Sequence, residues 1–334
     1  MFKEEEINDR LSIFRNDKIH FINSFEEDVK TGLTSEKKYL LPKYFYDEKG
    51  SELFEKICKT KEYYPTRSET EILDILSDTI SERNIDKNMI IELGSGTSVK
   101  TELLIRSFLK EREELVYIPL DVSNIIIESS RQLTENYSNL IINGVISFYE
   151  EGMEFIVSRF NSPKIILFLG SSIGNFTPGE SIEFMRMLAK YMNETDRLLI
   201  GFDLVKERKI LEDAYNDSDG ITAEFNLNIL SRINRELNAD FKIENFKHKS
   251  VFNEEDSRIE MYLESLSDMN VDLKSIDEKI KLKKGELIHT ENSYKFNKKM
   301  INELAERSGL VFSDYYTDEK EYFSLCAFRL NRNF

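Results

Sequence analysis

The sequence predicts an α/β fold built on a doubly wound, mostly parallel sheet, with a second domain inserted into it. Two observations lead to this prediction. Near-continuous apolar runs, typical of strands that are buried on both faces, alternate with amphipathic helical segments over residues 67–203. The alternation stops at residue 204 and resumes at residue 296, so the segment between them is expected to be an insertion. At 334 residues, the chain is long enough for about two domains.

Apolar periodicity places the expected elements along the chain. The first helix of the sheet region follows a capping box formed by Thr66 and Glu69, and a second capping box, at Thr177 and Glu180, begins a later helix. Strands are expected at 89–93, 115–120, 140–146, 165–169, 197–203, 258–263, 310–316 and 322–328. Further helices are expected at about 99–108, 123–136, 225–237 and 298–308.

Composition and charge exclude several classes of protein. The chain has 46 basic and 62 acidic residues, and its net charge of −16 repels phosphate backbones, so we expect no nucleic-acid partner. The longest apolar run, 165–169, is far shorter than a membrane helix, and the first residues lack a signal core. Two cysteines and three scattered histidines exclude a disulfide scaffold and a histidine-built metal site. We therefore expect a cytoplasmic protein, without a metal or membrane partner, that acts on a small molecule.

A glycine-rich turn follows the first strand of the expected sheet. Gly94 and Gly96 allow backbone amides to approach a ligand closely at the start of a helix. Asp121 ends the next strand, where its carboxylate can accept hydrogen bonds from both hydroxyls of a ribose. Because ligands bind at the carboxyl ends of the strands in open parallel sheets, these residues predict a nucleoside-type cofactor site. The alternative is a tight turn followed by a surface aspartate.

The glycine turn leaves more than one cofactor class open. A dinucleotide fingerprint needs a third glycine, and Val99 stands at that position. A Gly-x-Gly turn with an acidic strand tip is common in S-adenosylmethionine sites, which favours that cofactor. An NAD-dependent oxidoreductase and a non-catalytic ligand-binding protein are the competing hypotheses.

A few polar and aromatic residues outside the turn are also candidates for ligand binding. Asn175, between a strand end and a helix cap, can bind a carboxylate, although turn chemistry alone explains it equally. Tyr63, beside another tyrosine and a proline, can belong to a recognition surface or simply pack. Glu291 and Ser293 are two residues apart, so an extended backbone places them on one face, where they can hold an imidazole or an ammonium group; the simpler alternative is an exposed glutamate on an edge strand.

Seven short motifs then occur in order along the chain: Tyr44–Ser51, Glu62–Arg67, Glu92–Thr97, Phe168–Asn175, Asp203–Lys206, Ala223–Asn226 and Arg258–Met261. In these motifs, from about residue 40 to its end, the chain resembles the S-adenosylmethionine-dependent histidine Nα-methyltransferases of ergothioneine biosynthesis. Fungal N-methyltransferases of tryptophan derivatives are relatives of that family. Because the resemblance covers nearly the whole chain, it is far more specific than the glycine turn.

The resemblance implies a class I methyltransferase fold, which is Rossmann-like, with an inserted substrate-binding domain. It assigns residues 67–203 and 296–334 to the domain that binds S-adenosylmethionine, and residues 1–66 and 204–295 to the substrate-binding domain. The implied activity is transfer of up to three methyl groups to the α-amine of L-histidine, which gives hercynine. Tryptophan or another amine is the alternative acceptor. We expect the chain to act as a monomer.

The resemblance also implies which residues bind the cofactor. Gly94, Lys100 and Asp121 would contact S-adenosylmethionine, with Asp121 on the ribose. Phe148 would lie against the adenine. Ser147 would also belong to the cofactor site, but it stands where the family usually has an aspartate that contacts the adenine amine.

For the amino-acid part of the substrate, the resemblance implies three residues. Asn175 and Tyr215 would hold the carboxylate, and Tyr46 would lie near the amine as the catalytic residue. An amino-acid amine is mostly protonated at neutral pH and must lose a proton before it can attack a methyl carbon. We therefore expect Tyr46 or a water molecule to accept that proton.

For the substrate ring, the resemblance implies a pocket of Tyr63, Glu291 and Ser293, shaped by Met261. Glu291 can accept a ring N–H and Ser293 can bond the other imidazole nitrogen. An indole would leave part of this pair unsatisfied, which favours histidine over tryptophan. The family usually reads Arg-Thr-Glu-Ile-Ser where this chain has 289–293 as His-Thr-Glu-Asn-Ser, so the polar pair is present with different neighbours.

Overall fold

The computed structural model describes residues 2–17 and 22–332. The chain divides into two compact units. The first unit consists of Met1–Ile19, Ser68–Leu204 and Phe296–Phe334, and the second unit consists of His20–Arg67 and Val205–Lys295. Residues 205–295, which lie between two segments of the first unit, belong to the second unit together with residues 20–67.

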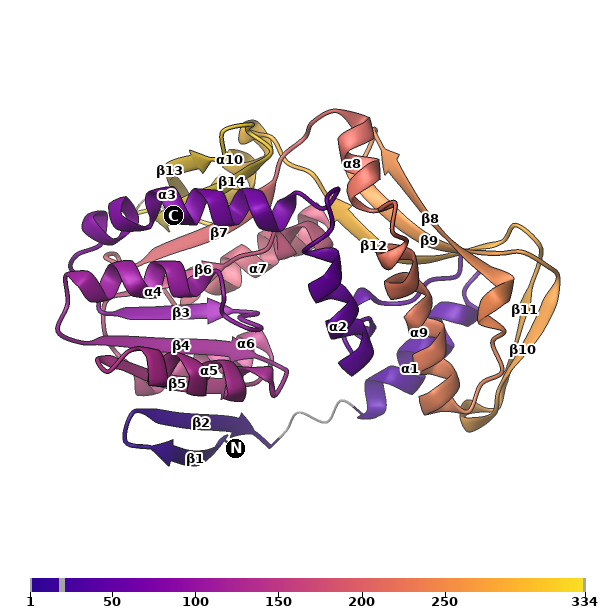
Figure 1. The fold of residues 1–334 in the computed structure, drawn as a ribbon, viewed down its shortest axis with the longest axis horizontal. Helices are drawn as coiled ribbons and strands as arrows, with labels where there is room; N and C mark the ends of the chain where they lie inside the picture. The colour runs from indigo at the N-terminus through magenta and orange to yellow at the C-terminus, as the bar shows by residue number, and fades with distance from the viewer. Residues whose placement is uncertain (1, 18–21, 333–334) are drawn as a thin grey trace. The chain divides into compact units, whose positions relative to one another are not determined.

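Among the described residues, nine strands form the sheet of the first unit (Figure 1). Their order across the sheet is β1 (Phe2–Asn8), β2 (Leu11–Asn16), β5 (Leu140–Ile146), β4 (Leu115–Asp121), β3 (Met89–Leu93), β6 (Lys164–Phe168), β7 (Arg197–Asp203), β14 (Phe323–Leu330) and β13 (Leu310–Thr317). Strands β2 to β7 pair in parallel, whereas β1 and β14 pair antiparallel with their neighbours. The mostly parallel sheet is confirmed.

The winding of the chain creates a switch point in the middle of this sheet. The chain runs outward from β3 through β4 to β5 and then returns to β6 on the other side of β3. The carboxyl ends of β3 and β6 therefore lie side by side where the strand order reverses, which is where open α/β sheets bind ligands.

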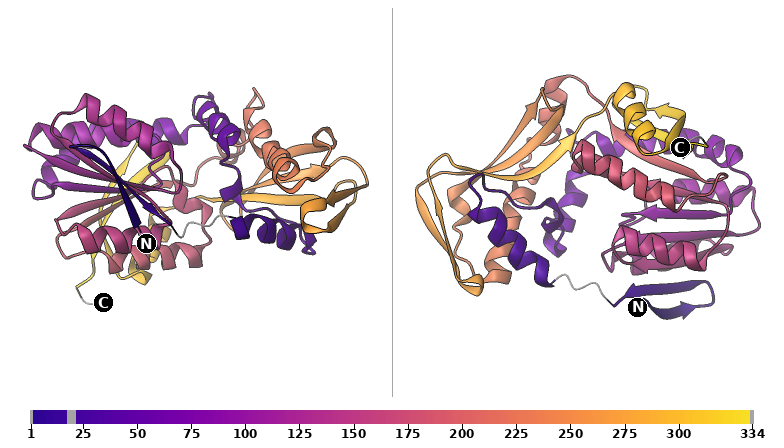
Figure 2. Two further views of the ribbon diagram at one scale, coloured as in Figure 1. Left: turned by 90° about the horizontal axis from the view of Figure 1, so that it is seen from below. Right: turned by 180° about the vertical axis from the view of Figure 1, so that it is seen from behind.

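Helices cover both faces of the sheet (Figures 1 and 2). Apolar residues of α3 (Pro65–Arg83), α4 (Thr101–Lys110) and α5 (Ile125–Asn136) share one core cluster with the strands. The remaining helices of this unit are α6 (Tyr149–Arg159), α7 (Pro178–Lys190) and α10 (Lys298–Arg307). Every residue of β3 and of β6 is buried, as expected for strands that are covered on both sides.

The N-terminal hairpin differs from the predicted domain division, which grouped residues 1–66 with the insertion. Residues 1–19 belong to the first unit because β2 pairs in parallel with β5 and thereby extends the sheet at its edge. Strand β1 is mostly exposed, and its acidic sequence lacks the apolar alternation that predicts a strand. Its pairing with β2 was therefore not visible in the sequence.

One of the two predicted capping boxes is present. Thr177 and Glu180 cap α7 with both reciprocal hydrogen bonds. The prediction at Thr66 and Glu69 was wrong, because α3 already begins at Pro65. The Glu69 carboxylate instead accepts the backbone N–H of Gly170, at the end of β6.

A three-stranded antiparallel sheet forms the centre of the second unit, in the order β12 (Leu287–Tyr294), β9 (Arg258–Ser265) and β8 (Phe246–Asn253). Helix α9 (Ile221–Leu237) packs on β8 and β9, and α2 (Glu48–Ile57) packs on α9 (Figure 1). The unit also contains α1 (Ile22–Thr34), η1 (Pro42–Tyr44), α8 (Arg208–Ala214) and the hairpin of β10 (Met269–Leu273) and β11 (Glu278–Leu282). Within the described part of the chain, no helix has the length and hydropathy of a membrane span.

Candidate functional site

The glycine turn lies at the switch point of the first unit, directly after β3. Gly94 and Gly96 have backbone φ angles of +66° and +50°, a region that side chains rarely allow. The Gly94 N–H donates to the Leu120 carbonyl (2.8 Å), which ties the turn to the end of β4. A Cβ at Gly96 would meet no atom within 4 Å, so this side of the turn is open to a ligand.

Asp121, the last residue of β4, is joined to this turn. One carboxylate oxygen accepts the Gly96 N–H (3.0 Å) and the other accepts the Ser123 N–H (2.9 Å). Burial raises the pKa of Asp121, although the bonds from Ser123 and Gly96 oppose the shift. Each carboxylate oxygen has a second lone pair, so the fixed carboxylate can also accept ribose hydroxyls.

Ser147 and Phe148 follow the neighbouring strand, β5. The Ser147 backbone N–H donates to the Asp121 carbonyl (3.1 Å), and its buried hydroxyl accepts a hydrogen bond from the Asn16 side chain (3.1 Å). Phe148 is 44% exposed, so it presents an apolar ring at the edge that carries the glycine turn. Such a ring suits a planar base. The sequence analysis missed Asn16, since nothing in the sequence indicated that β2 joins β5.

Lys100, at the start of α4, pairs with the carboxylate of Glu69 on α3. Glu69 is fully buried, and both of its oxygens accept the Gly170 N–H at 2.9 Å. A Cβ at Gly201 would lie 2.3 Å from a Glu69 oxygen, so a side chain on that strand would displace the carboxylate. Glu69 therefore joins α3, Lys100 and the tip of β6. The sequence analysis missed this role because it assigned Glu69 to a helix cap.

A buried polar network supports the glycine turn from the side of the sheet. Glu92, on β3, accepts hydrogen bonds from Thr101 (2.5 Å) and Tyr117, and the Tyr117 hydroxyl also bonds the Ser98 hydroxyl (2.8 Å). Burial raises the pKa of Glu92 to about 7, against the opposing effect of these two donors. Ser98 has a φ of 58°, so this network holds a left-handed residue of the turn in place.

The remaining predicted residue of the first unit is Asn175. It is the last residue of the short helix η2 (Ser172–Asn175) and is exposed. Tyr215, with which it is predicted to hold a carboxylate, belongs to the second unit. Their joint role stays a prediction.

Residues predicted to surround a ring lie on one face of the sheet in the second unit. Glu291 on β12 pairs with Met261 on β9, and Ser293 pairs with Ile259. Residues that pair across antiparallel strands point to the same face, so Glu291, Ser293 and Met261 share it. The shared face confirms the expected geometry of the Glu291–Ser293 pair.

A β-bulge separates this face from the residues just before it. His289 pairs with Tyr262 and Glu291 pairs with Met261, so Thr290 is the extra residue of the bulge. In a regular strand, residues 289, 291 and 293 would share a face. Because of the bulge, His289 lies on the opposite face from Glu291.

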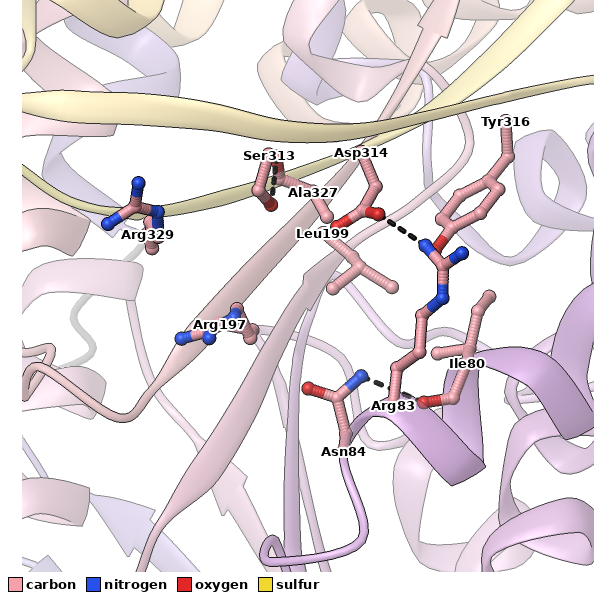
Figure 3. Close-up of a pocket in the computed structure, with 10 residues that line it drawn as sticks. All are labelled: Ile80, Arg83, Asn84, Arg197, Leu199, Ser313, Asp314, Tyr316, Ala327 and Arg329. Carbon is pink, nitrogen blue, oxygen red and sulfur yellow. Dashed lines mark hydrogen bonds and ion pairs between the residues drawn. The ribbon is translucent and has the colours of Figure 1, made fainter.

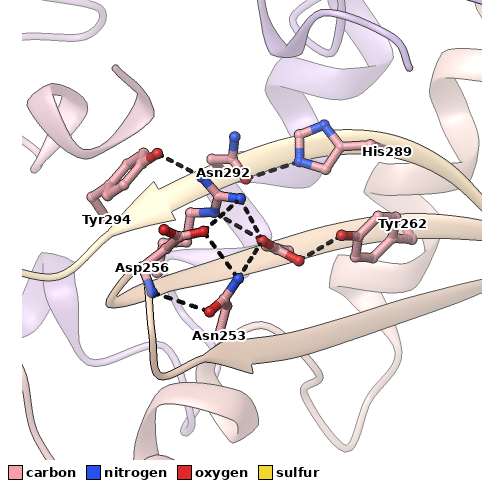
Figure 4. Close-up of polar contacts among 8 residues, drawn as sticks. Asn253, Asp256, Tyr262, His289, Asn292 and Tyr294 are labelled. Carbon is pink, nitrogen blue, oxygen red and sulfur yellow. Dashed lines mark hydrogen bonds and ion pairs between the residues drawn. The ribbon is translucent and has the colours of Figure 1, made fainter. Parts of the chain in front are cut away.

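The opposite face carries its own polar network (Figure 4). His289 bonds Asn292 (2.9 Å) and packs its ring edge-on against Tyr262 (5.3 Å between ring centroids). Arg258 pairs with Glu260 on the same face. The two positions at which this chain departs from the Arg-Thr-Glu-Ile-Ser pattern, His289 and Asn292, therefore lie away from Glu291 and Ser293.

The predicted tyrosines form a connected group of rings in the second unit. Tyr46 packs against Phe54, Phe54 against Tyr63, and Tyr63 against Tyr215, with ring centroids 5.6, 6.2 and 6.2 Å apart. The Tyr215 hydroxyl lies 2.7 Å from the Ser293 hydroxyl. Burial, followed by the influence of Tyr215, raises the pKa of Tyr63 well above its usual range. The structure therefore brings together Tyr46, Tyr63, Tyr215 and Ser293.

Tyr46 and Tyr63 differ in their access to solvent. Tyr46 is 47% exposed, although its ring also packs against Phe225 (5.7 Å). Tyr63 is buried. Of the two, Tyr46 has the easier route for passing a proton to water.

Glu291 is the acidic group of this face. Burial raises its pKa to about 7, while the positive charge of Lys295 acts in the opposite direction. Near neutral pH, Glu291 is therefore divided between a carboxylate that accepts hydrogen bonds and a carboxylic acid that can donate one. Either form suits a ligand with ring nitrogens.

Two basic residues that the sequence analysis did not single out support Tyr215. His248 bonds the Tyr215 backbone carbonyl through Nε2 (2.8 Å). Its Nδ1 lies 2.9 Å from the amide nitrogen of Asn226, which can only donate, so Nε2 carries the proton in neutral His248. Lys295 lies against the Tyr215 hydroxyl (3.1 Å). The alternation of residues 291, 293 and 295 would have indicated Lys295 from the sequence.

A separate pocket in the first unit contains none of the predicted residues (Figure 3). It is lined by Arg83, Arg197 and Arg329, among others, and Arg83 pairs with Asp314. Arg197 begins β7, so the pocket lies at the amino end of that strand. The glycine turn and Asp121 lie at carboxyl ends. Among the described residues, no cluster of His, Cys, Asp and Glu is placed to hold a metal ion.

Comparison with known proteins shows which family this chain belongs to. A family model described as "Histidine-specific methyltransferase, SAM-dependent" matches residues 25–330. The proteins named histidine N-alpha-methyltransferase from Mycobacterium tuberculosis and Mycolicibacterium smegmatis are each 38% identical to this chain, over 303 and 307 residues, and each match covers 90% of this chain and 94% of the relative. Ergothioneine biosynthesis protein 1 of Schizosaccharomyces pombe is 34% identical over 237 residues, which are 68% of this chain and 30% of that protein. The chain therefore belongs to the family of S-adenosylmethionine-dependent, histidine-specific methyltransferases.

Proposed function

We propose that this protein transfers methyl groups from S-adenosylmethionine to the α-amine of L-histidine, the activity in the names of its mycobacterial relatives. The observation that carries the proposal is the shared face of Glu291, Ser293 and Met261, with Tyr215 bonded to Ser293. The product with three methyl groups is hercynine. Since a further relative is named for ergothioneine biosynthesis, we place the reaction in that pathway.

The hydrogen-bonding groups of the proposed ring pocket explain why histidine is the proposed substrate. Glu291 accepts one imidazole N–H, Ser293 bonds the other ring nitrogen, and Met261 packs against the ring. An indole has one N–H and no acceptor nitrogen, so it leaves a buried polar group without a partner, at a cost of about 1–3 kcal/mol. Tryptophan is therefore the weaker candidate.

Residues of the first unit fit S-adenosylmethionine. Asp121 would accept the ribose hydroxyls, Phe148 would lie against the adenine, and Ser147 and the turn of Gly94 and Gly96, which is open at Gly96, would complete the nucleoside site. Lys100 would offer its ammonium group to the carboxylate of the cofactor. When bound, the cofactor supplies an electrophilic methyl carbon on a sulfonium. The family's cofactor is S-adenosylmethionine, which argues against the NAD hypothesis.

The protein's own contribution is to hold the substrate amine and to remove its proton. Tyr215 and Asn175 would bind the substrate carboxylate, which fixes the position of the α-carbon. Tyr46, which is half exposed, would accept a hydrogen bond from the amine and pass its proton to water. Holding the neutral amine in line with the methyl carbon would supply most of the acceleration. We further propose that the protein acts as a monomer in the cytoplasm.

A panel of amino acids tests the proposal. The purified protein is incubated with S-adenosylmethionine and each amino acid separately, and mass spectrometry counts the methyl groups added. We expect mono-, di- and trimethylated histidine and no product from tryptophan. Methylation of another amine, with histidine unchanged, would replace the substrate assignment.

A binding measurement separates loss of activity from loss of the cofactor site. Calorimetry with S-adenosylhomocysteine should show one site per chain, and an Asp121→Ala variant should lose it. Cofactor binding without turnover on any amino acid would support a non-catalytic relative instead.

A further inference from the structure

Lys295 is a fully buried lysine that directly follows β12 in the second unit. Its ammonium nitrogen lies 2.8 Å from the Ser293 hydroxyl and 3.1 Å from the Tyr215 hydroxyl. It also lies 4.7 Å from the centre of the Tyr215 ring. Its partners therefore include the hydroxyls of two residues proposed to bind the substrate.

The backbone holds Lys295 firmly in this position. Its N–H donates to the Ser257 carbonyl (2.7 Å), and the Ser257 hydroxyl donates to the Lys295 carbonyl (2.9 Å). Ser257 lies in the turn between β8 and β9 and has a φ of 53°. Two hydrogen bonds therefore fix the Lys295 backbone to the turn between β8 and β9, so its side chain starts from a fixed point.

The hydrogen bonds of this triangle can be counted. An ammonium group only donates, so Lys295 occupies one lone pair on each of the two hydroxyl oxygens. The bond between Tyr215 and Ser293 (2.7 Å) uses one of the two hydroxyl hydrogens. The other hydroxyl hydrogen is directed out of the triangle. Lys295 thereby biases the hydroxyl pair toward donating a hydrogen bond.

Glu291 complements this donor on the same face of the sheet. Its carboxylate is an acceptor, and the positive charge of Lys295 lowers the pKa of Glu291 against the effect of burial. The face therefore combines one acceptor, at Glu291, with one donor, at the Tyr215–Ser293 pair. Neutral imidazole has the matching set, which is one N–H and one acceptor nitrogen.

We propose that Lys295 is a positioning residue that turns the Tyr215–Ser293 pair into a hydrogen-bond donor and so makes the pocket select rings that contain an acceptor nitrogen. The inference rests on the proposed function, since it assumes that the ring lies between Glu291 and Ser293. It adds a specificity residue that does not touch the substrate.

Two analogues of histidine test the selection directly. Pyrrol-2-yl-alanine and pyrrol-3-yl-alanine each keep one ring N–H and replace the other nitrogen with C–H. We measure kcat and KM for both analogues and for L-histidine, and the affinity for each in the presence of S-adenosylhomocysteine by calorimetry. The wild-type protein should favour histidine over the better analogue by roughly 10- to 100-fold, the usual effect of one unmatched buried hydrogen bond.

Lys295→Met keeps the length of the side chain and removes its donors. This variant should lose roughly 10-fold or more in kcat/KM for histidine, mainly through KM, and much less for the analogues, so that the selectivity falls toward one. Affinity for S-adenosylhomocysteine should be unchanged. Lys249→Met, at an exposed position on β8, is the matched control and should retain the wild-type selectivity.

Ser293→Ala completes the test. If Lys295 acts through the hydroxyl pair, adding Lys295→Met to Ser293→Ala should cause little further loss of selectivity, whereas independent effects would multiply. If Lys295→Met does not fold, Lys295→Gln takes its place, since its amide oxygen can accept a hydrogen bond from the hydroxyl pair and the selectivity should again fall. Full selectivity in either folded variant would overturn the inference.

The same measurements separate this inference from the proposed function. A wild-type protein that neither binds nor methylates histidine refutes both. A wild-type protein that methylates histidine but accepts the pyrrole analogues equally well refutes only the role of Lys295.

Discussion

In the two groups of candidate residues, one in each unit, the properties of single side chains depend on their charge and protonation. Glu291 has a pKa raised to about 7 by burial, so its charge changes within the range where enzymes are assayed. Glu69, in contrast, is a buried carboxylate held between Lys100 and a backbone N–H. We propose that Glu291 contacts a ligand, whereas Glu69 holds protein groups in place.

Replacing Glu291 with glutamine should make histidine binding less dependent on pH. Above pH 7 the wild-type carboxylate is ionised and accepts the ring N–H through a charge-assisted bond, whereas below pH 7 it becomes protonated and that advantage is lost. The ratio of KM for Glu291→Gln to KM for wild type should be roughly 10 at pH 8 and approach 1 at pH 6. Protonation of histidine itself affects both proteins and cancels in the ratio.

The control for this experiment is Glu254→Gln, at an exposed carboxylate of the same unit. Its KM ratio should stay near 1 across the range. A ratio for Glu291→Gln that does not change with pH would show that the charge of Glu291 does not contact the ring.

Replacing Glu69 with glutamine should weaken cofactor binding without affecting the substrate pocket. The amide removes the charge that holds Lys100 and leaves one fewer acceptor for the Gly170 N–H. We expect the dissociation constant of S-adenosylhomocysteine to rise roughly 10-fold by calorimetry, the effect of losing about one charged hydrogen bond. Glu82→Gln, at an exposed position on the same helix, should leave it unchanged. An unchanged constant for Glu69→Gln would mean that Lys100 keeps its position without this partner.

At the scale of single elements, the strand that carries the proposed ring-binding pair departs from regularity. The bulge at Thr290 places His289 and Asn292 on one side of β12 and Glu291 and Ser293 on the other. A β-bulge changes which face the following residues point to. The sequence differences around the polar pair therefore do not alter the pair itself.

Changing His289 to arginine and Asn292 to isoleucine, the residues usual in the family, should leave histidine use nearly unchanged. Both side chains belong to the network on the opposite face (Figure 4). We expect KM and kcat for L-histidine to stay within roughly 2-fold of wild type, as for surface substitutions. A 10-fold change in KM would show that the opposite face also contributes to the site.

At the scale of the whole molecule, the residues proposed to bind the cofactor and those proposed to bind the ring are divided between two units. Gly94, Lys100 and Asp121 belong to the first unit, whereas Tyr63, Glu291 and Ser293 belong to the second. The chain passes between the units four times, after residues 19, 67, 204 and 295. Each unit is therefore built from segments that are distant in the sequence.

This division predicts where ligands slow hydrogen exchange. S-adenosylhomocysteine should protect most strongly the turn after β3 and the end of β4, because backbone amides there bond the proposed site. L-histidine, added second, should protect β12 and the end of α8. At 100 times its dissociation constant, a ligand stabilises the folded state by about 2.7 kcal/mol, which mass spectrometry of exchanged peptides detects readily. Protection by the cofactor that is strongest in β12 would contradict the assignment.

Local sequence patterns predicted most of the sheet and the glycine turn. Buried strands such as β3 and β6 appear as continuous apolar runs, and Gly94, Gly96 and Asp121 occur at strand ends in the expected order. The N-terminal hairpin was missed because β1 is acidic and exposed, so its pairing depends on β2 joining a distant strand. Resemblance to a family, rather than periodicity, indicated Tyr46 and Tyr215.

The parallel sheet, the insertion and the Glu291–Ser293 pair could be predicted from the sequence, because each is indicated by a pattern among residues that are neighbours in the chain. Contacts between distant segments were decided only by folding. Glu69 meets Gly170, Asn16 meets Ser147, and Lys295 meets Tyr215, across 101, 131 and 80 positions of the chain. A buried charge or amide takes whichever partner the packed core brings to it, and no local periodicity encodes that partner.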